Sequence, residues 1–229
     1  MRLKDKIAWI TGASRGVGEG IARVFHREGA NIIISARGEA ELNRVKDSCT
    51  DGPGTVTVLP FDVADAEQRD EAVGTVLAEF ERLDVLVNNA GISQRALAHE
   101  TVLEVDRRVM EVDFFAPVAL TKAVLPRMRE QQSGHLIVTS SVAGKHGVPY
   151  RTAYCAAKHA LHGWFDTLRI ELLDDNIDVM LLVIAGVTSD VAKYALTGDG
   201  TEFGHNDWGD GGMSITPVEC GERVVEAML

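Results

Sequence analysis

The sequence predicts an α/β fold: a doubly wound parallel sheet with helices on both faces. Three observations support this class. Short apolar runs alternate six times with segments whose apolar residues recur at helical spacing. The first run ends in a glycine-rich turn that leads directly into a helix. Polar residues follow several runs at the ends where parallel strands would meet. We expect residues 1–229 to form one domain, because the length suits a single core.

Each element follows from a local pattern. The apolar runs predict strands at 6–11, 31–36, 55–61, 85–87, 134–140 and 178–184. Helical spacing predicts a helix that ends near Glu28 before Gly29, and further helices at 39–48, 66–80, 103–131, 150–173 and 216–228. Asp65 is placed to cap the third helix, and Pro117 is expected to kink the long fourth one. Right-handed crossovers with a reversal of strand order would place a ligand crevice at the carboxyl ends of the strands.

Composition excludes several classes of function. The net charge of −11 argues against nucleic acid and against an anionic membrane surface as partners. No apolar run reaches the 18 residues of a membrane span, and the first predicted strand begins too early to leave room for a signal peptide. Cys49, Cys155 and Cys220 have no metal-like spacing, so we expect free thiols, no metal site and a cytoplasmic location.

The glycine turn after the first strand is typical of a nucleotide site. Gly12, Gly16 and Gly18 let the backbone approach a pyrophosphate, which would then lie at the positive end of the following helix. A tight structural turn is the alternative interpretation. The position of the turn between a strand and a helix favours the nucleotide.

The end of the second strand predicts which dinucleotide binds. Folds that prefer NAD usually carry an acidic residue there for the ribose 2′-hydroxyl, whereas this strand runs into Ser35, Ala36 and Arg37. Arg37 is suited to a forked contact with a 2′-phosphate, and Arg15 in the glycine turn could join it. Both arginines point to NADP(H) as the cofactor, with two solvated arginines as the alternative. Asp62, after the third strand, is placed to accept from the adenine amino group.

Three side chains between residues 140 and 160 have a spacing that suits proton transfer. Tyr154 and Lys158 are four apart, which places them on one face of a helix. A phenol has a pKa near 10, and a nearby ammonium favours its phenolate form. Ser141, at the end of a strand, could hold a carbonyl oxygen for Tyr154 to protonate. An ordinary solvated helix face is the alternative, and the upstream nucleotide pattern argues against it.

Two further features concern the site. Asp113 lies inside a helix that packs on the sheet, so its carboxylate is either exposed or functional. Residues 188–215 are rich in glycine and break the alternation, and we interpret them as a substrate lid. The substrate pocket would depend on this lid and on residues 93–97 and 143–150.

These motifs together resemble the short-chain dehydrogenase/reductase family in its single-domain Rossmann form. The resemblance rests on TGASRGVG, NNAG, Ser141 and YCAAK, with Tyr154 thirteen positions after Ser141, and it covers essentially the whole chain. The stretches FFAPVALTKAVLP and KYALTGDGTEFG are most similar to the branch of hydroxysteroid dehydrogenase-like reductases.

The resemblance implies hydride transfer between a nicotinamide and a carbonyl or alcohol. Tyr154 would be the general acid and base, Lys158 its cationic support, Ser141 the residue that orients the carbonyl, and Asp113 the fourth member of the catalytic set. Cofactor-binding roles would fall to Gly12, Ser14, Arg15, Gly16, Val17, Gly18, Arg37, Asp62, Val63, Asn89, Ala90, Gly91, Tyr154, Lys158, Gly186 and Thr188.

The chain departs from the family pattern at three places. Asp113 stands where the family usually has an asparagine, and its carboxylate would pair with Lys158 or disturb a proton relay. Ala185-Gly186 replaces the usual Pro-Gly after the sixth strand. The usual seventh strand is missing, so we expect a homodimer, and tetramer formation is in doubt.

The leading hypothesis is an NADP(H)-dependent oxidoreductase that acts on a small, apolar ketone, aldehyde or alcohol. A ketoacyl-carrier reductase is an alternative, although it would need a basic docking patch on this acidic chain. A second alternative, suggested by Asp113 and Ala185, is a catalytically weakened NADP(H)-binding or sensor protein.

Overall fold

The structure, a computed structural model, describes residues 1–188, 192–205 and 214–228. Its centre is a parallel sheet in the order β3-β2-β1-β4-β5-β6. The strands are β1 (Ile7–Thr11), β2 (Asn31–Ser35), β3 (Val56–Val58), β4 (Val85–Asn88), β5 (Gly134–Ser141) and β6 (Ile177–Ile184). The order reverses between β1 and β4, which confirms the doubly wound class. All six predicted strands are present, and the third is shorter than expected.

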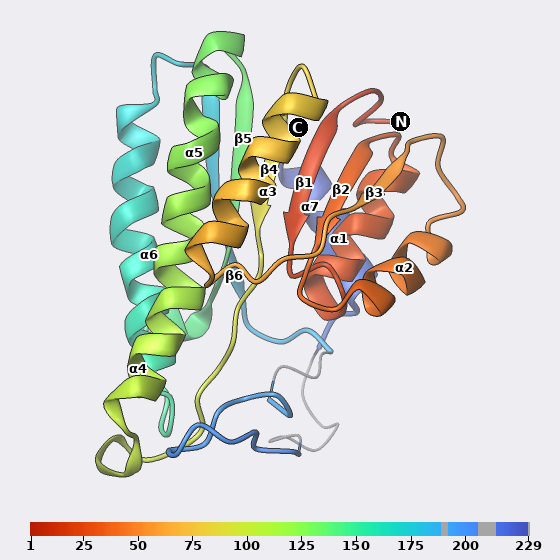
Figure 1. Cartoon of the computed structure of the whole chain (residues 1–229). Coiled ribbons are helices and arrows are strands. Elements are labelled where there is room, and N and C mark those ends of the chain that lie inside the picture. Colours follow the sequence, from red (N-terminus) through yellow and green to blue (C-terminus); the bar gives the residue numbers. More distant parts are fainter. Residues whose placement is uncertain (189–191, 206–213, 229) are drawn as a thin grey trace.

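Helices cover both faces of the sheet (Figure 1). They are α1 (Gly16–Arg27), α2 (Glu39–Ser48), α3 (Ala66–Glu79), α4 (Leu103–Met110), α5 (Ala116–Gln131), α6 (Thr152–Glu171) and α7 (Pro217–Ala227). Buried residues of α1, α2 and α7 share one core with the sheet, and those of α3, α5 and α6 share another. Two apolar layers thus cover the two faces of one sheet.

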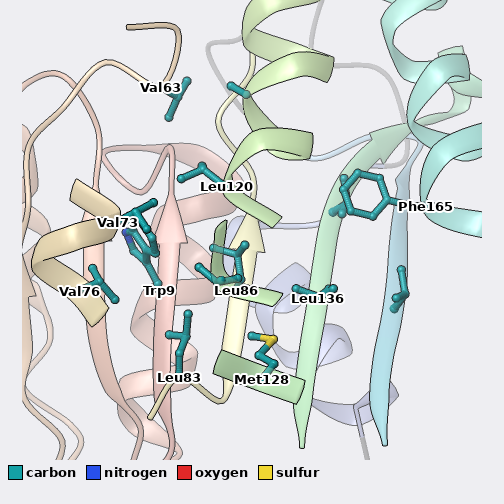
Figure 2. Close-up of a cluster of buried hydrophobic side chains, with 14 of the residues drawn as sticks. Trp9, Val63, Val73, Val76, Leu83, Leu86, Leu120, Met128, Leu136 and Phe165 are labelled. Atoms are coloured by element: carbon teal, nitrogen blue, oxygen red, sulfur yellow. The ribbon is translucent and has the colours of Figure 1, made fainter. Parts of the chain in front are cut away.

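The sheet is buried on both faces because its strands are apolar at consecutive positions. In β1, Ala8 and Ile10 belong to one core, whereas Trp9 between them belongs to the other. Figure 2 shows Trp9, Leu86 and Leu136 in the layer beneath α3, α5 and α6. The Trp9 indole N–H donates to Ser35 Oγ at 2.9 Å, which satisfies its polar atom inside the core.

The predicted helix over 103–131 is interrupted. Helix α4 ends at Met110, a π-helical turn spans Glu111–Phe115, and α5 begins at Ala116 with a proline in its first turn. Pro117 lies in the first turn of α5, where the backbone N–H of a residue has no partner within the helix, so proline is tolerated there. The break therefore lies just before Pro117 and not at it. π-Helical turns are frequent at functional sites, and this one contains Asp113.

The longest described part of the predicted lid, residues 192–205, is folded onto the loop after β4. Leu196 donates its N–H to Ser93 O at 2.8 Å and accepts from Arg95 N–H at 2.7 Å. Val102 N–H donates to Gly198 O at 2.9 Å. Both segments lie beyond the carboxyl ends of the strands, in the lower part of Figure 1. Residues 189–191 and 206–213 of the predicted lid lie outside the described residues, and the lid stays a prediction.

Within the described ranges, β6 forms one edge of the sheet. In the same part of the chain, no helix has both the length and the apolarity that crossing a membrane requires.

The amino-terminal end of the sheet contains a buried carboxylate. Asp84, just before β4, accepts from Ile7 N–H at 2.9 Å, from Lys6 Nζ at 3.1 Å and from the Arg82 guanidinium. Burial by itself raises the pKa of this carboxyl, but the hydrogen bonds from Arg82, Ile7 and Lys6 outweigh burial and hold the pKa below its usual value.

Asp84→Asn is therefore expected to lower the free energy of unfolding by about 1–3 kcal/mol at pH 7. A carboxyl with a lowered folded-state pKa stabilises the protein above its unfolded pKa of about 4, and that contribution is lost as the pH falls through the folded value. The difference between wild type and variant should shrink towards pH 3. Urea denaturation at both pH values measures it, with the exposed Asp178→Asn as control. A difference that does not change with pH would contradict the assignment.

Candidate active site

The glycine turn after β1 packs directly on the chain after β4. Gly12 has a φ of +64°, and a Cβ added to it would lie 2.7 Å from Ala90 Cα. A Cβ on Gly18 would lie 2.3 Å from Gly12 O. Larger residues are excluded at both positions, because one needs the left-handed conformation and both lack space. The turn, residues 12–18, thus forms a backbone cradle at the carboxyl end of the sheet, just after β1.

Asn89 ties three strand ends together. Its Nδ2 donates to Thr11 O and Gly12 O at 3.1 Å each, and its Oδ1 accepts from Thr139 Oγ1 at 3.1 Å. Thr11 Oγ1 in turn accepts from the N–H groups of Asn89 and Ala90. Sequence reasoning named Asn89 and Ala90 and missed Thr11 and Thr139. Both could have been found from the sequence, because each places a hydroxyl at or near the end of a buried strand.

The amino-terminal end of α1 lies at the same carboxyl end of the sheet. Arg15 occupies the N-cap position without a side-chain hydrogen bond to the helix. Ser14 O accepts from Arg44 Nη2 at 2.9 Å, and Arg44 also binds both carboxylate oxygens of Glu19. A glycine cradle beside an uncapped helix start fits the pyrophosphate of a dinucleotide. Arg44, which sequence reasoning missed, fixes the turn from α2.

The residues predicted for the adenosine half lie in two environments. Arg37 follows β2 and is exposed, whereas the Val63 side chain is buried in the core. Asp62 accepts from Arg108 Nη2 at 2.8 Å and from Ala64 N–H at 3.0 Å. Burial raises the pKa of Asp62, but Ala64 N–H, Arg108 and the charge of Arg37 outweigh burial and lower it. Sequence reasoning missed Arg108, whose partner lies 46 positions away.

Tyr154 and Lys158 lie one turn apart on α6. Lys158 Nζ is 5.5 Å from the Tyr154 ring centroid and donates to Thr139 O at 3.0 Å. It also lies 3.0 Å from Asp113 Oδ2, and the two residues are 4% and 0% exposed. The predicted pair is therefore part of a group of three, in which Lys158 and Asp113 are buried and Tyr154 is half-buried.

Asp113 is held by backbone as well as by charge. Its Oδ1 accepts from Ile92 N–H at 2.7 Å, and a Cβ on Gly91 would lie 3.2 Å from its Oδ2. Burial raises the pKa of Asp113 against the opposing effect of Lys158. Burial alone would lower the pKa of Lys158, but Asp113 and Tyr154 outweigh it and raise that pKa above its usual value. The buried lysine is thereby kept as a cation.

Ser141 ends β5 next to this group. Its Oγ accepts from Ala143 N–H at 3.1 Å, so the hydroxyl proton can be donated elsewhere. The preceding residue, Ser140, bonds to His162 Nε2 at 3.0 Å, and His162 Nδ1 lies 3.0 Å from Lys145 Nζ. Helix α6 is thus fastened to the end of β5 at His162, one turn after Lys158.

The segment after β6 is tied to the start of α7. Thr188 N–H donates to Ile215 O at 3.1 Å, and Ile215 N–H donates to Gly186 O at 3.3 Å. Thr188 Oγ1 lies 3.3 Å from Ser214 Oγ. Both predicted residues, Gly186 and Thr188, thus lie beyond the carboxyl end of β6, on the same side of the sheet as the glycine turn.

A cavity of about 670 Å³ lies beside the site. The segments predicted for the substrate pocket contribute to it, and so does residue range 192–205. Its lining consists of Arg95, Ala96, Leu97, Glu100, Tyr150, Thr197, Gly198, Asp199, Thr201 and Phe203. Tyr154 and Ser141 are not part of this lining.

Comparison with known proteins agrees with this geometry. The sequence model of the short chain dehydrogenase family matches residues 6–199. The Drosophila melanogaster "Dehydrogenase/reductase SDR family protein 7-like" is 42% identical over 232 residues, which cover 100% of this chain and 71% of that protein. The chain spans 65–75% of the length of such curated animal relatives.

Solved structures give the same result. A metagenomic short-chain oxidoreductase in complex with NADP has a TM-score of 0.82 at 28% identity, covering 100% of this chain and 91% of its own. A short chain dehydrogenase/reductase from Burkholderia phymatum in complex with NAD has a TM-score of 0.87, covering 100% and 87%; at 22% identity it shows the fold alone. The chain belongs to the short-chain dehydrogenase/reductase family.

Proposed function

We propose that this chain is an NADP(H)-dependent oxidoreductase that interconverts a ketone or aldehyde and an alcohol. The observation that carries the proposal is the buried ammonium of Lys158. It lies 5.5 Å from the Tyr154 ring, at the same carboxyl end of the sheet as the glycine cradle. When bound, the nicotinamide supplies a hydride to the carbonyl carbon or accepts one from the alcohol carbon. The protein supplies binding, orientation and the proton.

Tyr154 Oη moves the proton. In reduction it donates to the carbonyl oxygen, and in oxidation it accepts from the alcohol hydroxyl. The Lys158 ammonium supplies a positive charge 5.5 Å from the Tyr154 ring. The Ser141 hydroxyl, whose oxygen already accepts from Ala143 N–H, donates its proton to the substrate oxygen and orients it.

The cofactor would be held along the carboxyl edge of the sheet. The backbone of the glycine turn would bind the pyrophosphate, and Arg15 and Arg37 would bind the 2′-phosphate. The remaining predicted contacts are Asp62, Val63, Asn89, Ala90, Gly91, Gly186 and Thr188. Arg37 in place of a carboxylate after β2 supports NADP(H), and the NADP complex of a relative in this family agrees with it.

A small, apolar substrate is the proposed class. The Tyr154 ring packs beside a buried group that includes Val109, Ala153 and Ala157. Leu97 and Phe203 add apolar surface to the adjacent cavity. The cytoplasmic location and the homodimer stay predictions.

A second candidate is a catalytically weakened NADP(H)-binding or sensor protein. The observation that favours it is the carboxylate of Asp113, 3.0 Å from Lys158 Nζ, because it offsets part of the cationic field that Tyr154 would use. Turnover of the unmodified protein separates the two candidates, and the Asp113 variants described below test the cause.

The cofactor assignment predicts a measurable preference. Titration by fluorescence should show tighter binding of NADPH than of NADH. Arg37→Ser should weaken NADPH binding about tenfold and leave NADH unchanged, because it removes a charge-assisted contact to the 2′-phosphate. Arg107→Ser, on the exposed face of α4, is the matched control. A preference for NADH would contradict the 2′-phosphate contacts, and binding of neither would contradict the enzyme assignment.

A further inference from the structure

The 192–205 segment returns to the glycine turn and places an aromatic ring on it. Arg15 Cζ lies 4.0 Å from the centroid of the Tyr194 ring. Lys193 Nζ lies 5.7 Å from the same centroid. Two cations from distant parts of the chain therefore meet at one ring, at the corner where the sequence predicts a phosphate. This is notable in a chain whose net charge is −11.

The backbone fixes Tyr194 from both sides. Lys193 O accepts from Gly204 N–H at 2.9 Å, and Ala195 O accepts from Phe203 N–H at 2.8 Å. Ala195 is fully buried. The following residue, Leu196, is bonded to the loop after β4 through both of its backbone groups. The Tyr194 ring therefore belongs to a segment whose backbone is held by hydrogen bonds on both sides of it.

The stacking determines how Arg15 can be used. A guanidinium covered on one face by an aromatic ring still has its N–H groups free along its edge, where a phosphate accepts forked hydrogen bonds. Stacking also restricts the rotamers of a long, otherwise exposed side chain, so less entropy is lost when the phosphate binds. Lys193 adds a second positive charge beside the same ring.

We propose that Tyr194 is a positioning residue for cofactor choice: it holds Arg15 in place for the 2′-phosphate of NADP(H), and Lys193 strengthens the site. The inference rests on the proposed function. It adds Tyr194 and Lys193 to the residues that recognise the 2′-phosphate, beyond those in the glycine turn and at the end of β2. It also places cofactor discrimination on the segment that lines the neighbouring cavity with Thr197, Asp199 and Phe203.

The test compares Tyr194→Leu with Tyr194→Phe. The leucine removes the aromatic face, whereas phenylalanine keeps it. NADPH, NADH, adenosine 2′,5′-bisphosphate and AMP are titrated by calorimetry against the full chain. Tyr194→Leu should weaken NADPH and the bisphosphate about threefold to tenfold and leave NADH and AMP unchanged. Tyr194→Phe should match wild type. Lys193→Met should weaken the same two ligands and reduce the salt dependence of their binding.

Phe203→Leu is the matched control, since it removes a ring from the same segment that contacts Arg95 rather than Arg15. Its ratio of NADPH to NADH affinity should equal that of wild type. Equal loss of all four ligands in Tyr194→Leu, or no loss, would overturn the inference and leave the proposed function intact. Wild-type preference for NADH would overturn both the inference and the NADP(H) assignment. Thermal unfolding confirms that each variant is folded.

Discussion

Replacing Tyr154 with Phe should reduce carbonyl turnover by about 10²–10⁴-fold, the range that general acid catalysis contributes. The substitution removes only the hydroxyl that donates the proton, and the ring keeps its packing against Ala153 and Ala157. NADPH affinity should therefore change little. Turnover is measured by NADPH absorbance with a panel of ketones and aldehydes, and affinity by fluorescence titration.

Two controls make the Tyr154 result decisive. Thermal unfolding must show that the variant is as stable as wild type, and single-turnover rates must show that the loss lies in chemistry rather than in product release. Retention of more than about a tenth of the wild-type rate would contradict the role of Tyr154 as the proton donor.

Breaking the pair of Asp113 and Lys158 from one side should destabilise the protein by about 3–5 kcal/mol, because the remaining charge is buried without compensation. Asp113→Leu and Lys158→Met are the two one-sided variants, and the double variant should recover part of the loss. Asp113→Asn should cost less than Asp113→Leu, since an amide oxygen can still accept from Ile92 N–H. Urea denaturation of the four variants measures the coupling.

The pH dependence of this pair has a definite sign. Lys158 has a raised folded-state pKa, so its contribution is complete below its unfolded value of about 10.4 and is lost only as the pH rises through the folded value. In Lys158→Met the buried Asp113 carboxyl loses the cation that opposes its raised pKa and binds a proton more readily. The stability difference between wild type and Lys158→Met should therefore narrow as the pH falls. Glu111→Gln removes a half-exposed carboxylate from the same π-helical turn, where it makes a longer contact of 3.4 Å with Arg69, and should cost less than about 1 kcal/mol. A similar cost for Glu111→Gln and Asp113→Leu would contradict the buried pair.

Asp113→Asn also separates the two candidate functions. If the chain is an active reductase, the wild type turns over and the asparagine variant stays within about tenfold of it. If the carboxylate has silenced the site, wild-type turnover is absent and the asparagine variant gains it.

The fold was largely predictable because each strand carries its own signal. Consecutive apolar residues in β2 and β5 mark them as buried on both faces, and the glycine turn marks the first crossover. The π-helical turn was not predictable, because the apolar residues Val109, Val112 and Phe115 also fit a continuous helix. The placement of Pro117 was the one local sign of a break.

The candidate site was predictable where its residues lie at the ends of strands. It was not predictable where it depends on contacts between segments that are far apart in the sequence. Arg108 reaches Asp62, and Tyr194 reaches Arg15, from segments whose own spacing gives no sign of the partner. Asp113 lies between these cases. The family resemblance left two outcomes open for its carboxylate, pairing with Lys158 or disturbance of a proton relay, and the structure shows the contact with Lys158.

The Asn89 junction has a consequence for how the protein folds. Its hydrogen bonds join residues 78 and 50 positions apart, so the binding edge forms only after most of the chain has been arranged. Partly folded chains consequently lack the cradle, and a dinucleotide binds the native state alone. At a hundred times its dissociation constant, such a ligand adds about 2.7 kcal/mol to stability. We therefore expect the resistance of the chain to proteolysis to rise with the concentration of the cofactor.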